Sequence, residues 1–149
     1  MMAMADTQAS GGLEAALSQV GGRWTLQVID ALLDGPRRFG ELQAALDGIA
    51  TNVLAQRLRH LEAQGVVVST PYSTRPPRYA YELTASGREL GGALLLLTRW
   101  GSDHGGGTGT QDGPHHHACG TPLEPRWYCP TCDRTVHEEE SDVDDLRWV

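Results

Sequence analysis

Apolar residues recur at helical spacing through the first part of the chain. This spacing predicts four helices, over residues 13–20, from about 23 to 33, 39–46 and 51–64. The segments between them hold the residues that end helices and form turns, which are Gly21-Gly22, Asp34-Gly35-Pro36, Asp47-Gly48 and Gly65. The pattern therefore favours a mainly helical fold with short turns between successive helices.

The predicted helix over residues 51–64 is amphipathic. Its apolar positions share one face and include Leu54, Leu58 and Leu61. Because that face must pack on the core, Asn52, Gln56 and Arg59 are expected on the opposite side, in solvent. A polar face of this kind can read DNA bases, or it can be an ordinary solvated helix surface.

Beyond Gly65 the periodicity changes from helix to strand. Residues 66–68 and 79–81 predict two paired strands, and the loop between them contains three prolines and two arginines. Thr84 and Ser86 can cap a last helix that runs to about Trp100, with a Leu90/Leu94/Leu97 stripe. A turn between two helices followed by a basic hairpin describes a winged helix-turn-helix, which is mainly α with a small β-hairpin wing.

Composition divides the chain into five parts. We expect a disordered N-terminus over residues 1–12 and a DNA-binding and dimerisation domain over 13–101. A Gly-rich linker over 102–114 leads to a Cys/His module over 115–137, and an acidic tail over 138–149 follows.

A net charge of −7 is unusual for a nucleic-acid-binding protein, but the charge is unevenly distributed. Residues 13–104 hold nine arginines and nine acidic residues, whereas residues 105–149 hold three arginines and nine acidic residues. The acidity is thus mostly a property of the tail, and the arginines of the helical part cluster at the predicted turn and wing.

Several function classes are disfavoured. No apolar run approaches the roughly 20 residues of a membrane helix, and the N-terminus has no basic and apolar regions of a signal peptide. We therefore expect a cytoplasmic protein without a membrane partner. No Ser/His/Asp set, phosphate-binding glycine loop or catalytic carboxylate pair stands out, so no enzymatic activity is expected.

The joint pattern resembles the HxlR family of bacterial winged-helix transcription regulators over roughly residues 12–101. The stretches that carry the resemblance are GRWTL at 22–26, LDGPRRFGEL at 33–42, LAQRLRHLE at 54–62 and PPRYAYELT at 76–84. The resemblance implies a homodimer built from the first and last helices, which binds inverted-repeat operators in or near promoters.

Two positions depart from the family pattern. Several members carry a regulatory cysteine just before the first helix, where this chain has Ser10-Gly11-Gly12, so thiol sensing at that site is excluded. Members commonly have Ser before the recognition helix, where this chain has Ala50. Thr51 is then expected to take the capping role, which would shift the helix start by one residue.

The candidate DNA-binding residues fall into two groups. On the fourth helix, Asn or Gln can pair with adenine and Arg with guanine. At the turn and wing, arginines can hold phosphates or enter the minor groove, although local ion pairs with Asp34 or Glu82 are the alternative. The candidates are Arg38, Thr51, Asn52, Gln56, Arg59, Arg75 and Arg78.

The three cysteines form a second chemical signal. Cys119 follows a histidine run, and Cys129 and Cys132 flank Pro-Thr, so that HxxCG and CPxCD form two matching pairs. Three thiolates and one imidazole suit tetrahedral zinc, one per chain, in a closed structural site. His116 best fits the spacing as fourth ligand, and the other possibilities are His115, His117, His137 and Asp133. Three free thiols in a disordered tail are the alternative.

The sequence therefore predicts a DNA-binding transcription regulator with an appended zinc-ribbon-like module. One alternative is a protein–protein adaptor of the transcription machinery, because a winged helix with a zinc ribbon also occurs there. A second alternative is a metal- or thiol-responsive sensor. The sequence does not identify a small-molecule effector.

Overall fold

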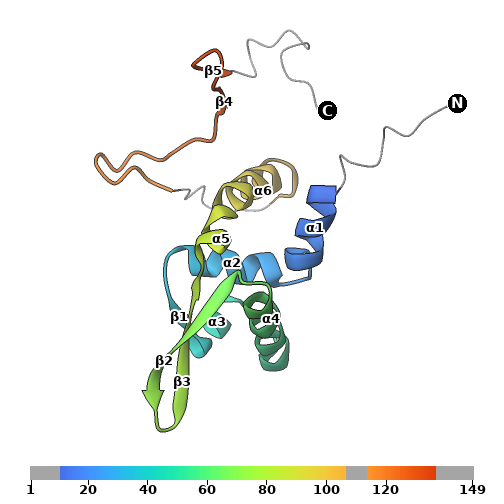
Figure 1. Cartoon of the computed structure of the whole chain (residues 1–149), viewed down its shortest axis with the longest axis vertical. Helices are drawn as coiled ribbons and strands as arrows, with labels where there is room; N and C mark the ends of the chain where they lie inside the picture. The colour runs from blue at the N-terminus through green and yellow to red at the C-terminus, as the bar shows by residue number, and fades with distance from the viewer. Residues whose placement is uncertain (1–10, 107–113, 137–149) are drawn as a thin grey trace, which may run out of the picture. The chain divides into compact units, whose positions relative to one another are not determined.

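A computed structural model of the chain describes residues 11–106 and 114–136 (Figure 1). The predictions for residues 1–10, for 107–113 of the linker, for His137 and for the acidic tail fall outside this range. The elements in chain order are α1 (Gly11–Val20), α2 (Thr25–Leu33), β1 (Arg37–Arg38), α3 (Phe39–Ala45), α4 (Thr51–Ala63), β2 (Val67–Thr74), β3 (Pro77–Leu83), α5 (Ala85–Glu89), α6 (Gly91–His104), β4 (Trp127–Cys129) and β5 (Arg134–Val136). The chain divides into two compact units, one ending at Leu94 and the other beginning at Leu95.

The core of the first unit is built mainly from one face each of α2 and α4. Val28, Ile29 and Leu32 of α2 are buried, as are the three leucines of α4, in the positions that the helical spacing predicts. The sheet contributes Val67 and Leu83 to the same cluster. A mainly helical fold with a small antiparallel sheet is therefore confirmed.

The helix-turn-helix consists of α3, a turn over residues 46–50, and α4. Gly48 provides the left-handed residue of the turn, at φ +84°, and Ile49 is buried beneath it. Thr51 does not cap α4, contrary to the sequence prediction. Ala50 is the N-cap, without a side-chain hydrogen bond, and the Thr51 hydroxyl instead accepts a hydrogen bond from the Gln43 amide at 2.7 Å.

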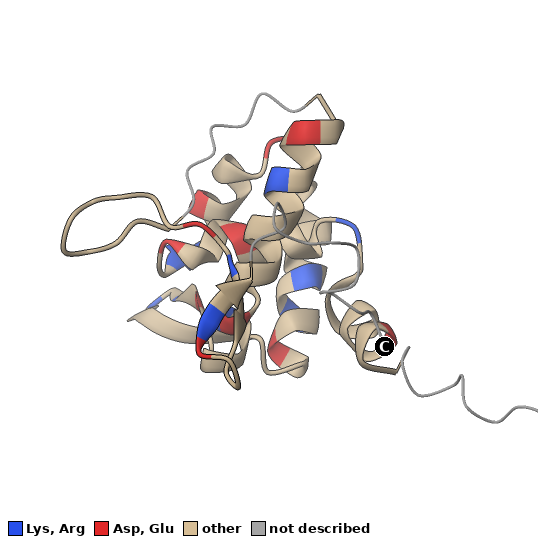
Figure 2. Ribbon diagram, turned by 90° about the horizontal axis from the view of Figure 1, so that it is seen from above, with Lys and Arg blue, Asp and Glu red and all other residues tan. Residues whose placement is uncertain are grey.

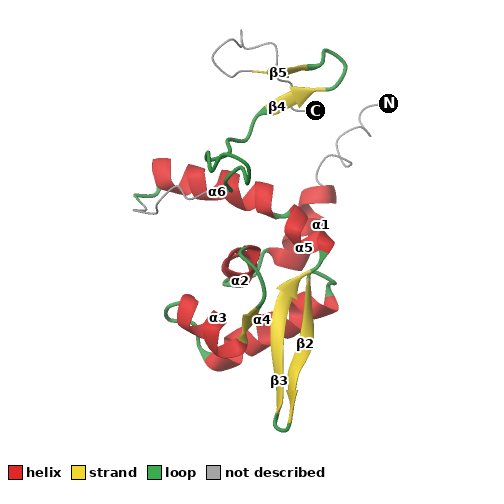
Figure 3. Cartoon of the chain, turned by 90° about the vertical axis from the view of Figure 1, so that its left-hand side faces the viewer, coloured by secondary structure: helices red, strands yellow, loops and turns green. Residues whose placement is uncertain are grey.

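The wing is longer than the sequence predicted (Figure 3). Most of the expected loop is strand, since β2 and β3 pair from Val67↔Leu83 out to Thr74↔Pro77. Pro71 is accommodated because β2 is an edge strand, and the register shifts between Pro71 and Ser73. A short strand that the sequence did not predict, β1, pairs with the other side of β3.

The last predicted helix is divided in two. Thr84 caps α5 as expected, with its hydroxyl oxygen accepting a hydrogen bond from the Gly87 amide at 3.2 Å. The chain breaks at Leu90, and α6 then continues to His104. The expected Leu90/Leu94/Leu97 stripe does not form one exposed face, because Leu94 is buried and Leu90 partly buried in the core. The exposed large apolar residues of α6 are Leu96, Leu97 and Trp100.

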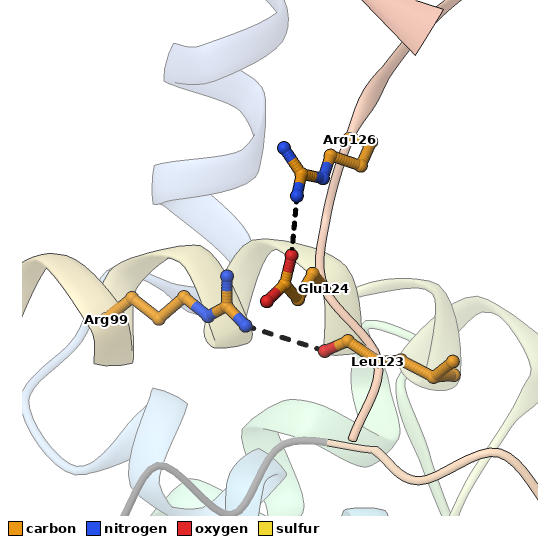
Figure 4. A network of polar contacts seen from close by, with 4 residues as sticks. All are labelled: Arg99, Leu123, Glu124 and Arg126. Carbon is orange, nitrogen blue, oxygen red and sulfur yellow. Dashed lines mark hydrogen bonds and ion pairs between the residues drawn. The ribbon is translucent and has the colours of Figure 1, made fainter. Parts of the chain in front are cut away.

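The residues beyond the linker form two small hairpins. Backbone hydrogen bonds between His116 and Thr121 and between Leu123 and Pro114 close the first, and β4 with β5 forms the second. The segment that joins them is tied by an Arg126–Glu124 ion pair of 2.7 Å and by Arg99, whose guanidinium lies 3.5 Å from the Leu123 carbonyl (Figure 4).

Charged residues of both signs are interspersed along the ribbons (Figure 2). Among the residues that the structure describes, none of the helices is both long and apolar enough to cross a membrane. The predicted cytoplasmic location stays a prediction.

Gly87 offers a test of the packing between α5 and the sheet. A Cβ at this buried position would lie 2.3 Å from the Val66 carbonyl oxygen, whereas at Gly92 of α6 it would meet nothing within 4 Å. Gly87→Ala should therefore lower the free energy of unfolding by about 1–3 kcal/mol, and Gly92→Ala should leave it equal or raise it by up to about 1 kcal/mol. Urea unfolding followed by circular dichroism measures both, and equal midpoints for the two variants would contradict this packing.

Candidate nucleic-acid interface

The polar face of α4 lies in solvent, as its spacing predicts. Asn52, Gln56 and Arg59 are exposed, and Leu54, Leu58 and Leu61 on the opposite face are at most 1% exposed. The buried leucines fix the rotation of the helix about its axis, so the three polar side chains project together on one side. Contact of these side chains with DNA stays a prediction.

Thr51 is exposed at the start of the same helix. Its hydrogen bond with Gln43 joins the first turn of α4 to α3, across the turn between them. No spacing rule links Gln43 to Thr51, so this bond could not be predicted from the sequence. The bond restrains the angle between α3 and α4.

The two arginines before α3 have different roles. Both lie on β1, where Arg37 pairs in register with Tyr81 and Arg38 with Ala80. Arg37 forms an ion pair of 3.5 Å with Asp34, which is the local alternative considered above. The guanidinium of Arg38 instead lies over the ring of Tyr72 in the wing, 4.4 Å from its centroid, in a cation–π contact.

The Arg38 backbone is also restrained, by a hydrogen bond to Glu41. The Glu41 carboxylate accepts a hydrogen bond of 2.6 Å from the Arg38 amide, at the start of α3. A carboxylate in the first turn of a helix satisfies a free amide there. The guanidinium is therefore presented beside the wing by a fixed backbone, while the side chain remains exposed.

The tip of the wing carries the other candidate arginines. Arg75 and Arg78 are both exposed, on either side of Pro76, whose carbonyl accepts a hydrogen bond of 3.0 Å from the Ser73 hydroxyl. A guanidinium at such a position can approach phosphates along a duplex or enter the minor groove.

An open groove with aromatic walls lies between the start of α3 and the wing. Its lining comes from three separate segments, so the groove could not be predicted from the sequence. The lining residues are Arg38, Phe39, Gly40, Glu41, Tyr72, Pro77, Arg78, Tyr79 and Tyr81. Burial, the nearby Glu62 and Tyr79 raise the pKa of Tyr81, with Arg59 opposing them. The Tyr81 phenol is therefore protonated at neutral pH and can donate a hydrogen bond from the wall of the groove.

The Cys/His candidates form two separate pairs. His116 Nδ1 lies 3.2 Å from Cys119 Sγ, and Cys129 and Cys132 interact with each other at the tip of the second hairpin. Among residues 11–106 and 114–136, no group of three or more His, Cys, Asp or Glu side chains is gathered around one point. The structure thus forms each pair of the predicted ligand set but does not place the two pairs around one point.

Backbone and side-chain hydrogen bonds act on these sulfurs. Hydrogen bonds with the side chain and then the backbone of Thr121 lower the pKa of Cys119. The backbone amide of Cys132 has the largest part in lowering the pKa of Cys129, and the Thr131 amide adds to it. The hydrogen bond with Cys129 raises the pKa of Cys132 in turn.

Comparison with known proteins agrees with this geometry. Residues 19–108 match the HxlR-like helix-turn-helix family. The chain belongs to this family.

Its relatives are named as regulators. An uncharacterised HTH-type transcriptional regulator of Mycobacterium tuberculosis is 38% identical over 125 residues, covering 81% of this chain and 77% of its own length. Because that share exceeds the winged-helix part, the match extends into the segment that contains the first hairpin. The uncharacterised regulator YtcD of Bacillus subtilis is 39% identical over 92 residues, covering 62% of this chain and 73% of its own length.

Solved structures have the same fold. The crystal structure of YtcD superposes with a TM-score of 0.60 at 38% identity, covering 64% of this chain and 97% of YtcD. A structure from Enterococcus faecalis assigned to the MarR family of regulators has a TM-score of 0.57 at 39% identity, covering 71% and 96% of the two chains. The chain is therefore a helix-turn-helix transcriptional regulator, as the sequence predicted. The absence of enzymatic activity stays a prediction.

Proposed function

We propose that this regulator binds inverted-repeat operator DNA as a homodimer, with α4 in the major groove and the wing along the backbone. The observation that carries the proposal is the exposed polar face of α4, which projects from a helix held to the core by its opposite face. A helix of this kind fits the major groove of B-DNA, whose bases present distinct donor and acceptor patterns there.

Three side chains of α4 supply the chemistry for reading bases. The amides of Asn52 and Gln56 can each donate and accept a hydrogen bond, as the N6/N7 edge of adenine requires. The planar guanidinium of Arg59 matches the O6 and N7 acceptors of guanine. Thr51, at the start of the helix, can hold a phosphate through its hydroxyl or backbone amide.

Arg38, Arg75 and Arg78 would neutralise phosphates. Arg38 is already ordered by its stacking on Tyr72, so it loses less conformational freedom on binding than a free arginine does. Arg37 is left out of this set because Asp34 already pairs with it. The tyrosine hydroxyls of the groove beside the wing can add uncharged phosphate contacts.

Exposed apolar residues support the homodimer. On α1, Leu13 and Leu17 are 68% and 56% exposed, and on α6, Leu97 and Trp100 are 53% and 64% exposed. Large side chains left in water on two helices favour burial against a second copy. A dimer with two recognition helices in turn matches the symmetry of an inverted repeat.

Arg59→Ala should weaken binding to a duplex selected by the wild-type protein from a random DNA pool. The expected loss is about 1–3 kcal/mol, together with relaxed preference at one position in each half-site. Arg88→Ala is the matched control, because Arg88 is an exposed arginine on α5, at the end of the wing opposite its tip. If the wild-type protein selects no sequence from the pool, the adaptor alternative is favoured.

Arg78→Ala should weaken binding to all duplexes alike, since a phosphate contact carries no sequence information. The slope of log K against log salt concentration should become shallower by about one unit. Fluorescence anisotropy at four or more salt concentrations measures the slope, with Arg88→Ala again as the control. An unchanged slope would show that Arg78 does not contact phosphate.

Leu17→Glu should dissociate the homodimer, because it places a charge in the apolar surface of α1. Multi-angle light scattering should give twice the chain mass of 16.1 kDa for the wild-type protein and a lower mass for the variant. Leu123→Glu, a similarly exposed leucine of the first hairpin, is the control. A wild-type mass of one chain at micromolar concentration would contradict the dimer.

A further inference from the structure

The first hairpin after the linker holds two ligand-type side chains at its tip. The His116 amide donates to the Thr121 carbonyl at 2.8 Å and the Leu123 amide to the Pro114 carbonyl at 2.7 Å, so residues 114–123 fold back on themselves. At the tip, the Gly120 amide donates to the His116 carbonyl at 2.8 Å. This tight turn brings His116 Nδ1 to 3.2 Å from Cys119 Sγ.

The second hairpin repeats this arrangement. β4 ends at Cys129, β5 begins at Arg134, and these two residues pair in register. Cys129 and Cys132 therefore lie on one tight turn. The backbone amides of Thr131 and Cys132 hydrogen-bond to the Cys129 sulfur, so the turn closes around that atom.

The two turns also share an unusual backbone conformation. The residue directly after the second ligand of each pair is left-handed, with φ +69° at Gly120 and +52° at Asp133. Glycine adopts the left-handed region freely, and aspartate is among the few other residues that are enriched there, so both residues suit this position of the turn. Two segments with different sequences thus form the same turn, each with a pair of metal-ligand side chains.

The structure also distinguishes among the candidate fourth ligands. Among the histidines that the structure describes, His116 approaches a cysteine sulfur, whereas His115 lies at the bridge with Pro122 on the hairpin strand. The Asp133 carboxylate accepts a hydrogen bond from the Tyr128 hydroxyl within its own hairpin. Of the candidates in the described residues, His116 is therefore the one that already forms a pair with a cysteine.

We propose that one zinc ion clamps the two hairpins together, with His116 and Cys119 from the first and Cys129 and Cys132 from the second. One imidazole and three thiolates on two tight turns provide the donor set of a tetrahedral structural zinc site. The pairs are separate in the described structure, and the nine residues from Gly120 to Tyr128 can span up to about 30 Å when extended, so the chain permits them to meet. Hairpins this short have little apolar area, so the metal supplies most of the free energy that holds them together.

Metal analysis of the full chain tests the stoichiometry. The protein is purified without a histidine tag and without added metal, so that no extra surface histidines bind zinc. The weak chelator removes any ion held only at the surface by the His115–His117 run. We expect one zinc per chain that survives dialysis against a weak chelator. A value near zero, or zinc that the weak chelator removes completely, would overturn the proposal.

Cobalt substitution tests the ligands. The full chain with Co²⁺ should show the visible bands of a tetrahedral site and a sulfur-to-cobalt charge-transfer band that weakens by about one third in Cys119→Ser. A spectrum unchanged in Cys119→Ser would mean that the first hairpin supplies no sulfur, which overturns the clamp. Circular dichroism of each variant checks that the winged-helix unit remains folded.

Competition with a zinc-binding dye tests the histidine. His116→Ala should weaken zinc binding by more than about 100-fold, beyond the 10- to 100-fold typical of an outer partner. His116→Cys should restore it, because a fourth thiolate also suits zinc. His115→Ala and His117→Ala are matched controls from the same run and should stay close to wild type. If either control loses affinity while His116→Ala does not, the assignment is wrong.

Discussion

The amphipathic character of α4 is the constraint on which the rest of the interface depends. Burying a leucine side chain stabilises the fold by about 1.5–3 kcal/mol, so three of them on one face leave the helix a single favourable rotation. That rotation places Asn52, Gln56 and Arg59 in solvent together. The same residues would be useless for base recognition on a helix free to turn, because hydrogen bonds to base edges require fixed directions. Core packing and the exposure of this polar face are therefore two consequences of one sequence pattern, and the proposed reading of DNA rests on the second.

The wing depends on a second and smaller constraint, the pairing of β1 with β3. Only two residues long, β1 nevertheless fixes the start of α3 against the sheet, and with it the approach of Arg38 to Tyr72. A flexible wing would need to lose conformational entropy on reaching the DNA. The stacking of Arg38 on Tyr72 ties the turn to the wing before any DNA is present, which lowers that cost for the binding proposed above.

The helices and the faces of α2 and α4 could be predicted because helical spacing extends over several turns of sequence. The features that could not be predicted arise from partners distant in sequence. Nothing in Arg37-Arg38 itself indicates a strand, and β1 exists because β3 offers it an unpaired edge. Pro71 suggested a loop, but an edge strand tolerates a residue without an amide proton. Helical spacing alone placed Leu94 on an exposed dimer stripe. The helix is instead interrupted at Leu90, and Leu94 is buried in the core.

The tail raises the question of whether a metal there could control DNA binding. Every cysteine of this chain lies at or after position 119, so thiol chemistry is confined to the tail. For zinc to act as an effector, the zinc-bound and zinc-free chains must differ in DNA affinity, and the coupling free energy must be the same in both directions. A clamp that only joins two hairpins has no such coupling, because both its states leave α4 and the wing unchanged. Control by metal would require a contact with the winged-helix unit that exists in only one metal state. Zinc affinity measured with and without bound operator DNA separates the two cases, since only a sensor changes its zinc affinity when DNA binds.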